Sequence, residues 1–473
     1  MRIPHRISKN VIAAYRRFIH ATKTKLRRCS PETSLLPQEQ GRTLRAEDVS
    51  WDDGVIPDLK ILALRAIVSA WKDNPVLEDL PTCVDRDVLL ETLPTDLPFE
   101  LTITRIEDGF YWERAAKDRW EHNDPGKYGD SWRRLYCERH LAEYLETLEA
   151  SYFEAQREEC EKLMTLVKDY IRVIRLHTLV PIKFSLEDCI SLGEGIKASP
   201  KLKKFSLTRS NLDRPRIAAI LQGMVSNDNI EELDVSHCKL MDTGAHAVGE
   251  FLSMHRKLKT LYLTNNSIGP IGMAGIVHGI LKASSTALKN LDFRLNPLQD
   301  EGADHVCALL VRNKTLETLN ISGCELGSEA GIALAGVLSS GCVKLEILSL
   351  DISNNDFGLT AGESFEAAVA SCSYIIHLDG RMCNFSKESE YSINERAYRN
   401  KQNMKKERNR ATFSLRHVHN SSSAKNLQQH PEVGSSFSES TSIVNHFTGR
   451  QIDVDEVEMM KSILKTWRRN NPA

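Results

Sequence analysis

Apolar positions along the middle of the chain follow a recurring eleven-residue pattern, seen clearly in LKTLYLTNNSI from Leu258. Apolar residues occupy positions 1, 4, 6 and 11 of this stretch, and an asparagine occupies position 9. Stretches with the same pattern start at Leu202, Ile230, Leu288, Leu316, Ile347 and Ile375. Successive starts lie 28 to 31 residues apart, and so regular a spacing indicates an internal repeat.

Each repeat predicts a short strand followed by a helix. Positions 4 and 6 alternate toward one side of a strand, and intervening segments such as DEGADHVCALLVRNK have helical apolar spacing. The pattern therefore predicts an α/β fold, a leucine-rich repeat solenoid of about seven 28-residue repeats over residues 173–393. A degenerate first repeat is expected to begin near Val173. Compact residues that carry a donor suit a buried turn at position 9: Ser210, Cys238, Asn266, Asn296, Cys324, Asn355 and Cys383.

The region 46–172, ahead of the repeats, has a different composition and contains five of the six tryptophans. Helical apolar spacing is present in LKILALRAIVSAW and along the run from Arg133 to Ile174, with prolines between the two. A terminal repeat exposes apolar surface unless another element covers it. We therefore expect an α-helical domain that caps the N-terminal end of the solenoid.

The remaining segments are predicted to be extensions. Residues 1–45 are basic, and a mitochondrial presequence is an alternative interpretation because acids are scarce there. Residues 394–417 predict a basic helical arm, although a solvated linker or a nuclear localisation signal has similar composition. The Ser-rich segment 418–450 is expected to be disordered. Residues 451–473 predict an amphipathic helix that docks onto a partner or folds back on the solenoid, with an apolar stripe of Val457, Met460, Leu464 and Trp467.

Charge separates the body of the chain from these extensions. The formal net charge is −2, yet residues 1–45 carry 11 Lys and Arg against 2 acids, and residues 394–416 carry 8 against 2. The two segments sum to +15, so the rest of the chain carries −17. An acidic body with basic arms favours attachment to an acidic partner. The arm residues expected to contact that partner are Arg396, Arg399, Lys401, Lys405 and Lys406.

Position 5 of each repeat is predicted to face outward from the strands, on the concave side of the solenoid. Four of its seven residues are aspartate, and a solvated strand face is the simplest interpretation. As a continuous strip, this acid-biased surface suits a basic protein segment and would repel nucleic acid. The residues predicted to bind protein are Glu232, Asp234, Tyr262, Asp292, Arg294, Asn320, Asp351, Asp379 and Arg381.

The sequence lacks the motifs of the common catalytic and metal sites. It has no Walker A loop, G-x-S-x-G or H-E-x-x-H, and its eleven cysteines include no Cys-x-x-Cys pair. We therefore expect no catalytic residues, no cofactor, no metal site and no enzymatic activity. No run is long and apolar enough for a membrane helix, so no membrane partner is expected either.

One enzymatic class remains as an alternative. GTPase-activating proteins for Ran-like small GTPases use a similar 28-residue solenoid but typically end in an acidic tail. This chain instead leaves its repeats through the basic run NERAYRNKQNMKKERNR. Innate-immune receptors share the repeat, but no nucleotide-binding domain precedes it here.

Several motifs carry a more specific resemblance: AEDVSWDDGVIPDLKILALRAIV, IEDGFYWERAAKDRW, GDSWRRLYCERHLAEYLE and, past the last repeat, SKESEYSINERAYRNKQ. From about residue 46 to 405 the chain resembles the family of the T-complex-associated testis-expressed protein, subunit 5 of the dynein regulatory complex. The Trp-rich motifs make the resemblance specific, since leucine-rich repeat proteins in general lack them.

That resemblance implies a structural subunit of the nexin–dynein regulatory complex, which links doublet microtubules and regulates dynein-driven motility. It implies a place in the cytoskeleton of the cytoplasm, at the axoneme of the cilium or flagellum. The implied partners are other subunits of the complex, both coiled-coil and leucine-rich repeat proteins. Tubulin or dynein-arm components are further candidates, and the basic arms are assigned to acidic partners from charge alone.

Overall fold

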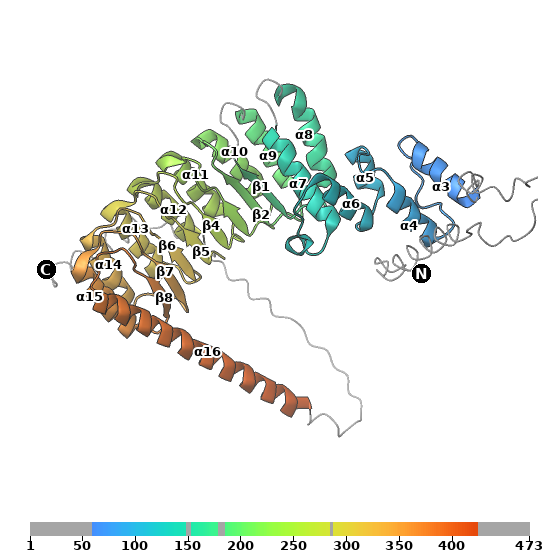
Figure 1. Ribbon diagram of the computed structural model, residues 1–473. Helices are drawn as coiled ribbons and strands as arrows, with labels where there is room; N and C mark the ends of the chain where they lie inside the picture. The colour runs from blue at the N-terminus through green and yellow to red at the C-terminus, as the bar shows by residue number, and fades with distance from the viewer. Residues whose placement is uncertain (1–58, 148–152, 178–184, 284–286, 424–473) are drawn as a thin grey trace, which may run out of the picture. The chain divides into compact units, whose positions relative to one another are not determined.

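The computed structural model describes residues 59–147, 153–177, 185–283 and 287–423 (Figure 1). Contacts group the chain up to Glu407 into one unit, and a second unit begins at Arg408. Eight parallel strands form one sheet in chain order. They are β1 (Val173–His177), β2 (Lys204–Thr208), β3 (Glu232–Asp234), β4 (Thr260–Tyr262), β5 (Asn290–Asp292), β6 (Thr318–Asn320), β7 (Leu348–Asp351) and β8 (Ile375–Asp379).

Helices alternate with these strands and cover one face of the sheet (Figure 1). They are α9 (Leu186–Lys197), α10 (Arg214–Val225), α11 (Met241–Met254), α12 (Pro270–Lys282), α13 (Gln299–Arg312), α14 (Ser328–Ser339), α15 (Gly358–Ser371) and α16 (Lys387–Ser423). Each repeat therefore contributes one strand and one helix, as predicted. Strand β1 begins at Val173 and pairs with β2, which confirms the degenerate first repeat.

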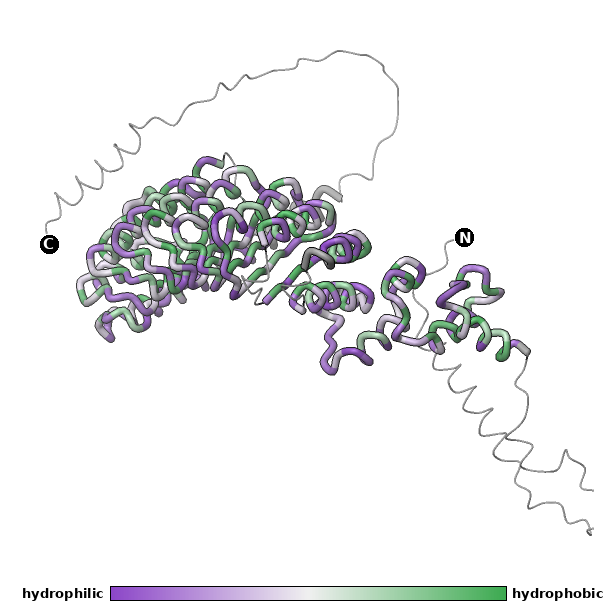
Figure 2. Tube along the Cα trace, turned by 90° about the horizontal axis from the view of Figure 1, so that it is seen from above, coloured by the Kyte–Doolittle hydropathy of each residue, from purple (hydrophilic) through white to green (hydrophobic). Residues whose placement is uncertain are grey.

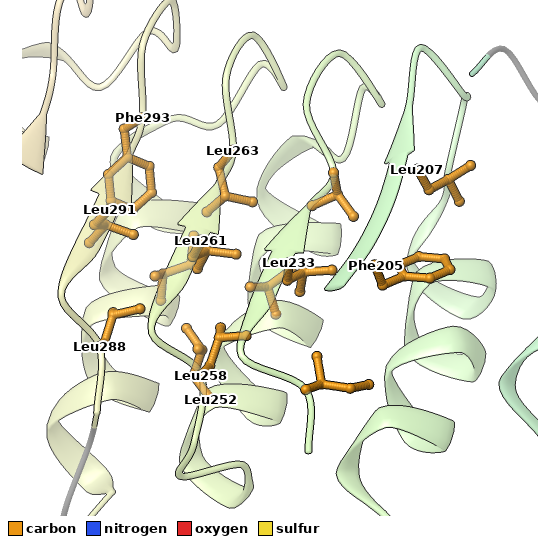
Figure 3. Close-up of a cluster of buried hydrophobic side chains, with 14 of the residues drawn as sticks. Phe205, Leu207, Leu233, Leu252, Leu258, Leu261, Leu263, Leu288, Leu291 and Phe293 are labelled. Carbon is orange, nitrogen blue, oxygen red and sulfur yellow. The ribbon is translucent and has the colours of Figure 1, made fainter. Parts of the chain in front are cut away.

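The register of the sheet brings equivalent apolar side chains into rows. Phe205, Leu233, Leu261 and Leu291 are direct neighbours at position 4 of successive repeats (Figure 3). All are almost fully buried between the strands and the helices. Burying one such side chain contributes about 1.5–3 kcal/mol, so the rows together hold the repeats in phase. Along the backbone, hydrophobic and hydrophilic stretches alternate from turn to turn (Figure 2).

Glycines let two of the helix pairs approach closely. A Cβ atom built on Gly279 of α12 would lie 2.0 Å from the carbonyl oxygen of Gly249 on α11. The same holds between α9 and α10, where a Cβ on Gly223 would lie 2.0 Å from the Gly193 oxygen. A side chain at either position would force the helices apart.

The position 9 residues form the predicted buried ladder. Asn296 donates its amide hydrogens to the Leu263 and Phe293 carbonyls at 2.9 and 2.7 Å, and its Oδ1 accepts the Asn266 N–H at 2.8 Å. In the cysteine copies the thiol donates instead, as Cys238 does to Leu207 O at 3.0 Å. All seven members are buried, so the sequence-based assignment of this row is confirmed.

Position 8 was not singled out by the sequence, but it has a constant backbone conformation. Its residue adopts a positive φ of 52–60° in each of the seven repeats that start at residues 202 to 375: Arg209, His237, Asn265, Leu295, Gly323, Asn354 and Met382. This left-handed turn lets the chain leave the strand and direct position 9 inward. Only Gly and Asn adopt it with little strain, so four of the seven copies are strained.

Among the described residues ahead of the sheet lie six α-helices and a short 3₁₀ helix, in agreement with the predicted helical character of this region. They are α3 (Leu59–Ala70), α4 (Cys83–Thr92), α5 (Phe99–Arg105), α6 (Phe110–Arg119), η3 (Pro125–Tyr128), α7 (Trp132–Thr147) and α8 (Phe153–Val167). The run from Arg133 to Ile174 is not one helix, because it divides into α7, α8 and the start of β1. Trp71 and Trp112 are buried in a core continuous with that of the repeats.

Each end of the sheet meets a polar side chain from a flanking helix. Glu138 of α7, only 7% exposed, accepts the N–H groups of Arg172 and Val173 with one oxygen at 2.8 and 3.1 Å. At the other end Asn400 of α16 donates to the Cys372 and Ile375 carbonyls at 2.8 and 3.0 Å. Ile393 and Ala397 of α16 are also buried. Helix α16 thus begins before the predicted boundary at 394, and its first turns complete the solenoid.

Candidate protein-binding surfaces

The face of the sheet that the helices leave uncovered carries the position 5 row, which we call the open face: Ser206, Asp234, Tyr262, Asp292, Asn320, Asp351 and Asp379. Five of these side chains accept the backbone N–H of the residue two positions later. The oxygen of Asp234 lies 3.0 Å from the Ser236 nitrogen, and that of Asp379 lies 3.1 Å from the Arg381 nitrogen. The other three bonds are Asp292 to Arg294, Asn320 to Ser322 and Asp351 to Ser353.

This local bond gives the acidic row a structural role that the sequence analysis did not assign. An Asp or Asn that binds the backbone two residues on stabilises a turn, and here it supports the bend between the strand and the left-handed residue at position 8. The signal was present in the sequence as Asp or Asn at position 5 followed by a polar residue at position 7. Acid bias on this face is therefore partly a consequence of turn chemistry.

Burial further limits what the row can contact. Asp292, predicted to bind a partner, is only 8% exposed and pairs with Arg294 at 3.0 Å. Its carboxylate also accepts the Thr264 hydroxyl at 3.2 Å, so it is a structural residue in the free chain. Asn320 donates to Asp351 at 2.9 Å along the row. Glu232 pairs with Lys204 at 2.5 Å.

Three members of the predicted strip remain available on the open face. Arg294 and Arg381 are exposed. Arg381 forms an ion pair with the Asp379 carboxylate at 2.6 Å, and its hydrogen bond lowers the pKa of Asp379. Tyr262 is half-buried, and none of the described residues hydrogen-bonds to its hydroxyl. Burial, reinforced by Glu232, raises the pKa of Tyr262, so it stays a neutral donor.

The five residues of the predicted basic arm lie on α16 and are all exposed. Arg399 pairs with Glu395 at 2.6 Å, and Arg396 donates to the Ser392 hydroxyl at 3.2 Å. Lys401, Lys405 and Lys406 have no ion-pair partner among the residues described. The predicted docking stripe of Val457, Met460, Leu464 and Trp467 lies outside the described residues and stays a prediction.

Several buried titratable groups of the helical region and the repeats have pKa values that favour their neutral form. His140 accepts from Arg119 at 2.7 Å, and burial together with this cation lowers the pKa of His140 to about 4. Burial raises the pKa of the Cys189 and Cys238 thiols to about 12. Within the described ranges, no group of three or more His, Cys, Asp or Glu is placed to hold a metal ion. No helix there is long and apolar enough to cross a membrane.

Comparison with known proteins agrees with the repeat and extends it. A family profile described as "Leucine Rich repeat" matches residues 226–249, 255–277, 284–307 and 312–335. Dynein regulatory complex subunit 5 of Mus musculus is 28% identical over 269 residues, which cover 44% of this chain and 54% of that protein. The protein of the same name from Chlamydomonas reinhardtii is 25% identical over 200 residues, with 40% and 49% covered.

A solved tropomodulin C-terminal domain from Caenorhabditis elegans is 11% identical and covers 47% of this chain and 98% of that domain, with a TM-score of 0.23. The chain spans about half the length of the curated relatives it matches.

Proposed function

Because the chain belongs to the family of dynein regulatory complex subunit 5, we propose that it is a non-catalytic scaffold subunit of that complex in the axoneme of cilia and flagella. In this role it helps to link neighbouring doublet microtubules and to regulate the sliding that dynein drives. Its partners are other subunits of the complex, and α16 contacts an acidic partner.

The observation that carries the proposal is the continuous eight-stranded sheet with a polar side chain bonded at each end. Such a surface holds its side chains in fixed places before a partner arrives, so binding orders few of them. On the open face the internal bonds of the position 5 row add to this rigidity. We assign partner contact to Tyr262, Arg294 and Arg381. The two arginines are exposed although each pairs with an aspartate, and the Tyr262 hydroxyl is free to form a hydrogen bond.

A localisation experiment tests the proposal. A tagged chain is expressed in a flagellated cell that lacks its own copy, and axonemes are washed with salt before fractionation. We expect the chain to remain with the axoneme and to restore normal motility. A chain found only in the soluble fraction would contradict the assignment.

The enzymatic alternative makes the opposite biochemical prediction. A GTPase activator would accelerate hydrolysis by a Ran-like GTPase, and an exposed arginine at the repeat edge would be required. We expect no acceleration by the full chain and no difference with Arg381→Ala. Accelerated hydrolysis that is lost in this variant would replace the scaffold proposal.

A further inference from the structure

Helix α16 has one face against the solenoid and another that no described residue covers. Ser389, Ile393 and Ala397 are buried on the first face. Tyr391 and Tyr398, in contrast, are 71% and 61% exposed, among the most exposed large hydrophobic residues of the described chain. Asn394, Lys401 and Lys405 are exposed as well. We call Tyr391, Asn394, Tyr398, Lys401 and Lys405 the outer stripe of α16.

The spacing of the outer stripe is that of a coiled-coil seam. Its members follow one another at intervals of 3, 4, 3 and 4 residues, which places them along one line of the helix. The two tyrosines occupy equivalent positions one heptad apart. Large side chains held at this spacing on an exposed helix insert between four residues of a second helix, so the stripe is shaped for a helical partner.

Charge then selects the kind of helix. Lys401 and Lys405 occupy the second half of the stripe, and neither has an ion-pair partner among the described residues. The neighbouring Lys406 and Arg399 add positive charge, of which only Arg399 is balanced, by Glu395. A second copy of α16 in parallel register would place lysine against lysine. An acidic helix complements the positive charge of the outer stripe, whereas a second copy of α16 repels it.

We propose that the outer stripe of α16 pairs with an acidic amphipathic helix of another polypeptide. Tyr391 and Tyr398 pack against the apolar seam of that helix, and Lys401 and Lys405 meet its carboxylates. The inference deepens the proposed function, on which it rests, because it names the class of partner that the basic arm contacts. It also divides the predicted arm residues. Lys401 and Lys405 lie on the seam, Arg399 and Lys406 lie beside it, and Arg396 lies on the opposite side of the helix.

The test uses the full chain and three labelled synthetic peptides. The first has three heptads with Leu at the two seam positions and Glu at the flanking positions. It can form a helix when it pairs with a basic helix, but its own copies repel one another. The second carries Lys in place of Glu. The third has the residues of the first in scrambled order, with one residue of each heptad replaced by proline, and cannot form a helix. Fluorescence anisotropy at low and high salt measures binding.

We expect the acidic heptad peptide to bind and to bind less tightly at high salt, and the other two to bind at least about tenfold more weakly. The variants Tyr398→Ser and Lys401→Glu should each weaken binding about tenfold or more. The control Lys406→Glu changes the same charge beside the stripe and should weaken it less than about threefold. Circular dichroism checks that each variant retains its helix.

Three outcomes would overturn the inference. Equal binding of the proline peptide would mean that charge alone attracts an acidic chain, with no helical partner. Unchanged binding by Tyr398→Ser would show that the tyrosines do not take part in the contact. An equal loss of affinity with Lys406→Glu would show that the contact does not follow the outer stripe. A chain that stays with the axoneme but binds no acidic helix contradicts only this inference, whereas peptide binding without axonemal localisation contradicts only the proposed function.

Discussion

The two ends of the sheet are bonded by side chains of different kinds, a carboxylate at the first strand and an amide at the last. Between interior repeats, two successive N–H groups donate to one carbonyl of the preceding repeat, as Lys203 and Lys204 do to Arg172. The equivalent N–H groups of the first repeat belong to Arg172 and Val173, since Val173 is in register with Lys204. Within the part of the chain that the structure describes, no strand precedes them in the sheet, and a single oxygen of Glu138 accepts both. This carboxylate takes the place of a carbonyl from a missing repeat.

At the C-terminal end, the Asn400 amide donates to two carbonyl oxygens of the last repeat. In the interior, His255 donates to the position 1 carbonyl of Ile230, 25 residues before it. Asn400 donates to the position 1 carbonyl of Ile375, also 25 residues before it. Asn400 therefore continues an interior bond, whereas Glu138 imitates one with a charged group. The N-terminal end therefore has a side chain that replaces a ladder acceptor, whereas the C-terminal end keeps a bond that an interior repeat also makes.

The largest difference between the ends should appear when each cap is removed. In Glu138→Ala, the N–H groups of Arg172 and Val173 lose their acceptor. Arg134, which pairs with Glu138 at 2.6 Å, also loses its partner. We expect a loss of about 3–5 kcal/mol in the free energy of unfolding, because a broken buried pair leaves an uncompensated charge. Urea denaturation measures this loss, and amide exchange should report it at Arg172 and Val173.

The matched control for this variant is Glu138→Gln, which keeps an oxygen acceptor but not the charge. It should retain the exchange protection of Arg172 and Val173 and lose about half as much stability. If both variants left these amides protected, the carboxylate would not be the cap.

Removal of the C-terminal cap should cost less. Asn400→Ala leaves two carbonyl acceptors without their donor but creates no unpaired charge, so we expect a loss of about 1–3 kcal/mol. Exchange should increase in α15 and the start of α16 and stay unchanged at β1. The control Asn403→Ala, at an exposed position on the same helix, should fall within about 0.5 kcal/mol of the parent. A loss equal to that of Glu138→Ala would erase the proposed asymmetry.

Acid should loosen the N-terminal region before the C-terminal end. The pKa of His140 is lowered to about 4 from its ordinary value of 6.5, because burial and Arg119 disfavour its charged form. The stability that neutral His140 contributes is therefore fully present above about pH 6.5 and is lost as the pH falls toward 4. The pKa of Asp379, near the other end, is lowered from 3.8, so its contribution persists until the pH falls below that value.

A pKa unit corresponds to about 1.4 kcal/mol, and partial exposure of His140 reduces the expected loss at pH 4 to about 1–2 kcal/mol. Amide exchange of α6 and α7 between pH 7 and 4.5, corrected for intrinsic rates, measures it. The variant His140→Gln should flatten this dependence. A steeper loss at β8 than at α7 over the same range would contradict the assignment.

Periodicity alone predicted the repeats, because every unit must bury the same positions against its neighbours. The first strand at Val173 and the buried row that includes Asn266 and Cys238 followed from that rule. What failed was the run from Arg133 to Ile174, where one apolar spacing continues across two helices.

The candidate surfaces were predicted less completely than the fold. The alternation of side chains along a strand correctly placed most of the position 5 row on the open face. It could not show that Asp292 is buried beneath Arg294, or that five members of the row bond to the backbone. The caps Glu138 and Asn400 were missed altogether. A polar residue on an amphipathic helix looks the same in sequence whether it faces solvent or the end of a sheet.

The smallest expected effect concerns the strained turn of the last repeat. Met382 has a φ of 57° and is 77% exposed, so its side chain contributes little packing to offset the strain of a left-handed residue. Met382→Gly should raise the free energy of unfolding by up to about 1 kcal/mol, since glycine adopts this conformation freely. Met382→Ala keeps a Cβ atom and should give no such gain. Calorimetry compares the two, and an equal gain from alanine would show that removing an exposed apolar side chain, and not relief of the backbone, stabilises this end of the solenoid.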